Sequence, residues 1–112
     1  MSYNVKTTSN FEREAKALFK RHRSLKNDLS IFIDSLEQNP FQGDELTPGV
    51  RKIRMAITSK GRGKSGGARI ITYTVVISEN FGNAYLLSIY DKSDFSTVDI
   101  AEINNMINSL EL

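Results

Sequence analysis

The chain has 112 residues, enough for a single domain spanning residues 1–112, with a formal net charge of +2 and 39% hydrophobic residues. It contains no cysteine and one histidine, His22, so a disulfide or a metal site built from thiolate and imidazole is effectively excluded. A site built from carboxylates alone is the remaining alternative, and we expect neither a metal nor another cofactor. No apolar run reaches the roughly 18–20 residues that cross a bilayer, and the N-terminus lacks a secretory pattern, so we expect a cytoplasmic protein without membrane contacts.

The N-terminal third predicts one strand followed by two helices. Residues 2–8 alternate enough for a short strand. Ser9 and Glu12 then form a capping-box pattern ahead of apolar residues at helical spacing. A second helical pattern covers residues 24–39 and is stopped at Asn39-Pro40. Because the joint between the two patterns is short, they predict an antiparallel helical hairpin.

The remainder of the chain predicts a loop, three strands and a final helix. Residues 40–49 form the loop, since they are rich in Pro and Gly. Ser96 and Asp99 repeat a helix-cap pattern before the last apolar stripe. The order β-α-α-β-β-β-α predicts an α+β fold with a mostly antiparallel sheet, in which the opposite face or one end is left for partners. The predicted strands are Val50–Thr58, Ala68–Ser78 and Ala84–Asp91.

Charge is segregated along the chain. Residues 1–49 hold seven basic and seven acidic residues, residues 50–78 hold seven basic and none acidic, and residues 79–112 hold one basic and six acidic. A concentration of positive charge this strong attracts polyanions even when the net charge is small. A solvated polar strand and loop is the simpler alternative. The glycines of "GRGKSGG" do not form a nucleotide-binding P-loop, because the motif spacing and the following helix are both missing.

Strand alternation predicts where the basic side chains point. Lys52 and Arg54 share one face, opposite the apolar Ile53 and Met55, and so should point outward together. Arg51 falls on the apolar side of the strand. At the start of the strand it can swing out to solvent, or its aliphatic stem can cover apolar surface. A basic face beside a basic, glycine-rich loop predicts contacts to a nucleic-acid backbone. The predicted RNA- or ribosome-binding cations are Arg51, Lys60, Arg62 and Lys64.

Three further residues are interpreted from their positions, two of them in two ways. Tyr90 is either an aromatic at the edge of the core or a residue that stacks on a base or transfers a proton. Lys92, at a strand end beside Asp91, is either a surface ion-pair partner or a site residue. His22 ends the first helix, where a cation suits the helix dipole, and a structural role is predicted.

The stretch "VRKIRMAITSKGRGKSGGARIITY", followed by "YLLSIYDKSDF", resembles the RelE/ParE superfamily of bacterial toxins and is most similar to the HigB-type toxins. The resemblance runs from about Leu46 to Phe95 and is only topological over residues 1–39. It implies a toxin of a type II toxin–antitoxin system, which enters the ribosomal A site and cuts mRNA. The implied chemistry is metal-independent attack of the ribose 2′-OH on the adjacent phosphorus. The implied partner is a helix-turn-helix, HigA-like antitoxin.

Carried over residue by residue, the resemblance assigns the basic pair of the family to Lys52 and Arg54, and its strand-opening arginine to Arg69. Lys92 matches a basic residue at the end of the last strand. The chain departs from the pattern at Val98, where relatives carry a proton-transferring aromatic, and Tyr90 is the substitute. Arg54 and Arg69 are expected to clamp the phosphorane, and Lys52 to take the 2′-OH proton.

Two alternatives belong to other functional classes. ParE toxins of the same superfamily inhibit DNA gyrase and cleave nothing. An inactive toxin that persists as an antitoxin-binding module is the third possibility. Cut mRNA after induced expression favours the nuclease, broken DNA favours the gyrase inhibitor, and normal growth favours the inactive module.

Overall fold

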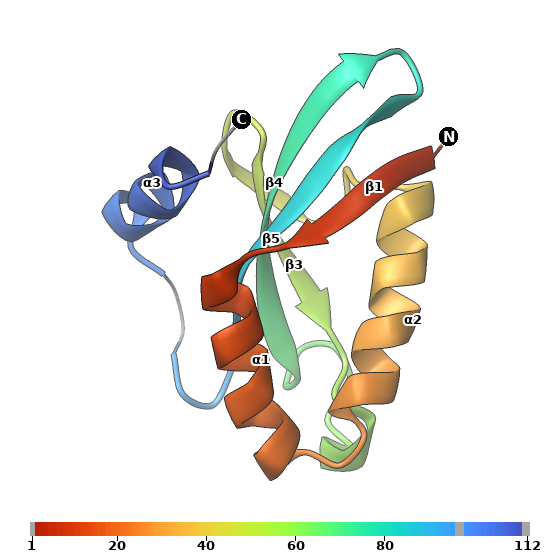
Figure 1. The fold of residues 1–112 in the computed structure, drawn as a ribbon. Coiled ribbons are helices and arrows are strands. Elements are labelled where there is room, and N and C mark those ends of the chain that lie inside the picture. Colours follow the sequence, from red (N-terminus) through yellow and green to blue (C-terminus); the bar gives the residue numbers. More distant parts are fainter. Residues whose placement is uncertain (1, 96–97, 111–112) are drawn as a thin grey trace.

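The computed structural model describes residues 2–95 and 98–110 and shows an α+β fold built on one five-stranded sheet (Figure 1). The strand order is β1-β5-β4-β3-β2, and among the described strands the β1–β5 pair alone is parallel. This confirms the predicted fold class and mostly antiparallel sheet. The strands are β1 (Ser2–Thr7), β2 (Asp44–Thr47), β3 (Val50–Met55), β4 (Ala68–Ser78) and β5 (Phe81–Asp91).

Two long helices run in opposite directions over one face of the sheet, as the short joint predicts (Figure 1). Their apolar residues pack on alternate strand residues such as Ile53, Ile70 and Ile89 to form the main core. None of the helices in the described ranges has the length and hydropathy needed to cross a bilayer. The helices are α1 (Ser9–Arg21), α2 (Leu25–Gln38), the single 3-10 turn η1 (Thr58–Lys60) and α3 (Ile100–Asn108).

The opposite face carries a smaller core beneath α3. Ile103 of α3 is fully buried against Val50, Ile71 and Leu87. Simple alternation places Leu87 on the other face, but the β4–β5 register shifts between Ile71 and Thr72 and skips Leu87. Such a bulge lets two successive residues share one face. On the part of this face beside α3, Arg54 of β3 is exposed and Lys52 is half-buried.

Residues 44–47, predicted as loop, form the edge strand β2 instead. This strand pairs with β3 through Asp44 opposite Lys52 and Glu45 opposite Arg51. Its four residues are polar or half-buried and show no apolar alternation, so the strand is defined by its partner rather than by its own sequence. The order of elements therefore has one more strand than predicted.

The N-terminal caps of α1 and α3 differ from those predicted from the sequence. The first cap is Thr8 rather than Ser9, since the Thr8 hydroxyl accepts from the Phe11 amide at 3.2 Å. The last helix starts at Ile100, where the Asp99 carboxylate accepts from the Ala101 amide at 2.9 Å. The other predicted cap of that helix, Ser96, lies outside the described residues. The strand predicted to reach Thr58 ends at Met55, and the strand predicted to start at Ala84 starts at Phe81.

Candidate nucleic-acid interface

Three neighbouring strands place a row of polar side chains on the face that also carries α3. The register sets Arg54 of β3 opposite Arg69 of β4, and Arg69 opposite Tyr90 of β5. Lys52 lies two residues before Arg54 and so shares this face. These four residues are called the basic row below. The fold therefore brings together four of the five predicted catalytic residues.

Arg54 and Lys52 are the accessible cations of the basic row. Arg54 is exposed and Lys52 is half-buried. Together with Lys64 they line a groove of about 400 Å³. Within the described residues, none of these three forms an ion pair with a carboxylate. Asp44, opposite Lys52 in the β2–β3 register, also lines this groove, so the three cations outnumber one acidic residue and leave the net positive potential that attracts a phosphate.

Arg69 is buried, with 4% of its surface exposed, and its guanidinium is committed to backbone oxygens. One nitrogen donates to the carbonyls of Lys64 and Ala68 at 3.1 and 3.2 Å, and the other donates to the carbonyl of Ser65 at 3.0 Å. The planar guanidinium group can donate to several neighbouring carbonyl oxygens at once. The guanidinium therefore holds the loop before β4 in place, while its charge stays under the basic row without a carboxylate partner among the described residues.

Tyr90 is also buried, and its hydroxyl has no hydrogen-bond partner among the described residues. Its ring packs edge-on against Phe95, with 5.8 Å between centroids. Burial raises the pKa of Tyr90, and the nearby charge of Arg69 opposes this only in part. The hydroxyl is therefore protonated at neutral pH and able to donate. Val98, where the resemblance expects an aromatic, packs in the apolar cluster under α3.

The basic loop between β3 and β4 stands beside the basic row. Arg62 and Lys64 are exposed on it. At Gly67 an added Cβ would lie 2.2 Å from the Met55 carbonyl oxygen, so the loop returns to the sheet too closely for a side chain. The amide of Lys92 donates to the Gly67 carbonyl at 3.0 Å, which places the exposed Lys92 just past the end of β5 and next to this loop.

Two predicted RNA-binding cations lie elsewhere. Arg51 is on the helix side of the sheet, 5.7 Å from the Phe41 ring centroid and 3.9 Å from the Glu45 carboxylate. Its guanidinium thus lies over an aromatic ring on the helix side of the sheet. The Lys60 amine is mostly buried and donates to Asp91 at 2.7 Å. Neither side chain faces the groove of Lys52 and Arg54.

Asp91 is the centre of a buried ionic cluster that sequence patterns do not reveal. Its carboxylate, 1% exposed, contacts the Lys60 amine, His22 Nε2 at 2.8 Å and the Arg21 guanidinium at 3.3 Å. Burial by itself would raise the pKa of Asp91, but hydrogen bonds from Lys60, Ser93 and His22 outweigh it and hold the pKa well below its usual range. The cluster ties α1, η1 and the end of β5 together, so His22 has the structural setting predicted for it.

No protein-family model matches the sequence. Among solved structures, the fold is similar to that of a mutant of the E. coli toxin RelE in the free state. The TM-score is 0.55, the sequence identity is 14%, and the alignment covers 100% of both chains. At this identity the likeness shows a RelE-like fold. It covers the α1–α2 hairpin as well as the region where the sequence resemblance is strong.

Proposed function

We propose that this chain is a single-domain, HigB-type toxin of a type II toxin–antitoxin system, acting in the cytoplasm as a ribosome-dependent mRNA endoribonuclease. The observation that carries the proposal is the basic row. Its cations and a protonated tyrosine come from three adjacent strands on one face of the sheet, with Arg54 exposed and Arg69 and Tyr90 buried beside it. The RelE-like fold supports the same conclusion. The chemistry proposed is metal-independent.

The order of side chains across the sheet suits an in-line displacement at phosphorus. The 2′-oxygen attacks the phosphorus and the bond to the 5′-oxygen breaks, which leaves a 2′,3′-cyclic phosphate and a 5′-hydroxyl. The groups that take and give the proton must lie on opposite sides of the phosphate. Lys52 on β3 and Tyr90 on β5 lie on opposite sides of Arg69. Lys52 is the proposed base, and the protonated Tyr90 hydroxyl the proposed acid.

The two arginines of the basic row have different proposed roles. Arg54 is exposed, and its guanidinium can donate to the equatorial oxygens as they gain negative charge. Arg69 supports the site from below through its charge and through the loop that it fixes. Exposed Arg62, Lys64 and Lys92 would contact RNA phosphates or the ribosome around the reacting linkage.

The proposed partners are the ribosomal A site with its mRNA and a helix-turn-helix, HigA-like antitoxin. Of the seven basic residues in 50–78, Lys60 and Arg51 pair with acidic residues, and the other five suit the RNA partner. Because the ribosome supplies the alignment of the mRNA, the isolated chain is expected to be a poor nuclease.

The test is inducible expression with mapping of new mRNA 5′ ends. The wild type should stop growth and create in-frame cuts in translated messages. Arg54→Ala should reduce cutting by about 10²-fold with little loss of stability, because Arg54 is exposed. Lys16→Ala, which removes an exposed cation of α1, is the matched control and should cut normally. Broken DNA without new mRNA ends would instead identify a ParE-like gyrase inhibitor, and normal growth an inactive module.

A further inference from the structure

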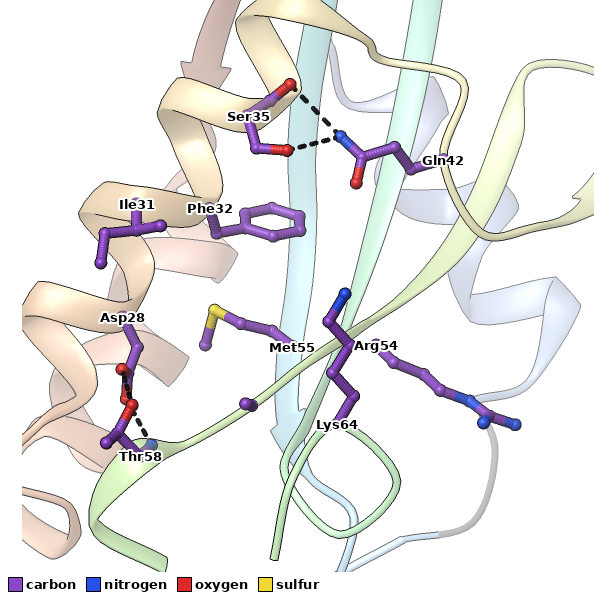
Figure 2. Close-up of a pocket in the computed structure, with 10 residues that line it drawn as sticks. Asp28, Ile31, Phe32, Ser35, Gln42, Arg54, Met55, Thr58 and Lys64 are labelled. Atoms are coloured by element: carbon purple, nitrogen blue, oxygen red, sulfur yellow. Dashed lines mark hydrogen bonds between the residues drawn. The ribbon is translucent and has the colours of Figure 1, made fainter. Parts of the chain in front are cut away.

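A second cavity, of about 260 Å³, lies between α2 and the end of β3 (Figure 2). This volume is slightly below the ~300–1,000 Å³ of pockets for drug-sized ligands, so the cavity suits a single ring system. Its apolar part is formed by Ile31 and Phe32 of α2 and by Met55 of β3, and Ser35, Gln42 and Thr58 add polar groups. A mostly apolar cavity with a few polar groups matches the shape and chemistry of a nucleobase.

The walls of the cavity are already fixed. The buried Asp28 carboxylate accepts from the Thr58 amide at 2.9 Å, from the Thr58 hydroxyl at 2.6 Å and from the Ser24 hydroxyl at 2.7 Å. Burial raises the pKa of Asp28, but these bonds outweigh it and lower the pKa overall. The carboxylate is therefore ionised and satisfied, and it locks η1 onto α2. A preformed cavity loses little entropy when a ligand binds.

Gln42 leaves one polar atom unused at the opposite end of the cavity. Its amide nitrogen donates to the Ser35 hydroxyl at 2.9 Å, the Ser35 carbonyl at 3.3 Å and the Asn39 carbonyl at 2.8 Å. The dashed lines of Figure 2 show the two bonds to Ser35. The amide oxygen of Gln42 has no bond within the described residues. It can accept from an N–H at the edge of a base.

Lys64 joins the cavity to the basic row. It lines both the cavity and the groove that holds Lys52 and Arg54. The edge strand β2 pairs with β3 only as far as Lys52, so among the described residues no strand covers the β3 edge from Ile53 to Met55. A strand of RNA on the basic row can therefore pass round this edge. Its phosphates would meet Lys64 before the cavity is reached.

We propose that this cavity binds the base of a nucleotide that flanks the cleaved linkage, with the Lys64 amine on the intervening phosphate. The positive charge at the mouth, and its continuity with the groove of the basic row, favour RNA over other occupants. Ile31 is 61% exposed at the rim, and a bound base would cover it. The nature of the ligand rests on the proposed function, but the site itself does not require cleavage or a ribosome.

The experiment uses the full chain labelled with ¹³C in the methionine methyl groups. Met55 lies at the cavity floor, whereas Met106 of α3 lines a separate cavity with Tyr90 on the face of the basic row and reports on contacts there. The probe is a trinucleotide of adenosine with 2′-O-methyl groups, which cannot be cleaved. An abasic trinucleotide with the same phosphates is its control. The Met55 methyl signal should move with the adenosine probe and stay in place with the abasic one.

A matched pair of variants tests the rim. Ile31→Glu places a carboxylate at the mouth and should weaken binding of the adenosine probe about tenfold, the order expected for one base contact. Ile77→Glu changes an apolar residue of similar exposure, 58%, at the β4–β5 hairpin and should bind normally. Both positions are exposed, so both variants should fold.

Three results would overturn the proposal. These are an equal shift of Met55 with the abasic probe, unchanged binding by Ile31→Glu, and a shift caused by an acidic peptide but not by RNA. The last result would identify a protein-docking cavity instead. The readout is independent of nuclease activity. If mRNA is cut in cells but the Met55 signal does not move with the adenosine probe, the base-binding proposal is refuted and the proposed function stands. If the Met55 signal moves but no mRNA is cut, the proposed function alone is refuted.

Discussion

Replacing Asp91 with asparagine tests whether the ionic cluster holds the end of β5. The substitution keeps the shape and one acceptor oxygen but removes the charge that faces Lys60, His22 and Arg21. Breaking a buried pair by neutralising one partner costs about 3–5 kcal/mol, because the other charge stays buried. The new amide keeps an acceptor for the backbone N–H of Ser93, so the lower end, about 3 kcal/mol, is expected.

Urea unfolding followed by circular dichroism measures this loss, which corresponds to a fall in Tm of roughly 10–20 °C in a chain of this size. Asp94→Asn is the matched control. Among the described residues, Asp94 forms an ion pair with Arg21 alone, at 2.6 Å, and both side chains are well exposed, so the control should lose less than about 1 kcal/mol. Equal losses in the two variants would refute the argument from burial.

The lowered pKa of Asp91 predicts that the stabilising effect of this carboxylate depends on pH. The pKa of Asp91 is lower in the folded state than the value of about 3.9 for an unfolded chain. The stability that Asp91 contributes is therefore complete above about pH 4 and is lost as the pH falls through the folded-state pKa. The difference in unfolding free energy between wild type and Asp91→Asn should shrink below about pH 4. A difference that stays constant down to pH 2 would contradict the assignment.

Three further substitutions separate structure from function. Tyr90→Phe removes an unpaired buried hydroxyl, so it should leave stability unchanged or raise it by about 1 kcal/mol and still reduce mRNA cutting in cells; undiminished cutting would exclude the acid role. Thr8→Ala should cost about 1 kcal/mol in urea unfolding, and Ser9→Ala close to nothing, because Thr8 is the cap; the reverse order would restore the sequence prediction. Gly67→Ala should destabilise the chain more than Gly61→Ala, because the new Cβ at Gly67 would clash with the Met55 carbonyl oxygen. At Gly61 a Cβ meets nothing within 4 Å, and the positive φ of Gly61 costs about 1 kcal/mol.

Much of the candidate site could be predicted from local patterns. Alternation places Lys52 and Arg54 on one face because successive strand residues point to opposite sides. The β-branched run of β4 and the glycine-rich loop before it predict that Arg69 opens the next strand. Since adjacent strands in a meander pair with each other, these cations had to meet.

The partners of individual cations could not be predicted in this way. Lys60 lies among basic residues in the sequence, yet its amine is paired with Asp91, which follows 31 residues later. The resemblance implies that Arg69 clamps a phosphate, whereas its guanidinium donates to the carbonyls of its own loop. A run of basic residues in the sequence shows how many charges are present. Which of these side chains are buried, and what they pair with, depends on which distant segments pack together.

The sequence by itself determined the α+β class, the order of the main elements and the concentration of positive charge in residues 50–78, because these follow from periodicity and composition within short windows. Only the tertiary structure decided which cations remain available to a ligand, that β2 exists and that a cavity opens beside Lys64. The physical reason is that solvation, ion pairing and edge-strand hydrogen bonds are set by contacts between residues far apart in the chain.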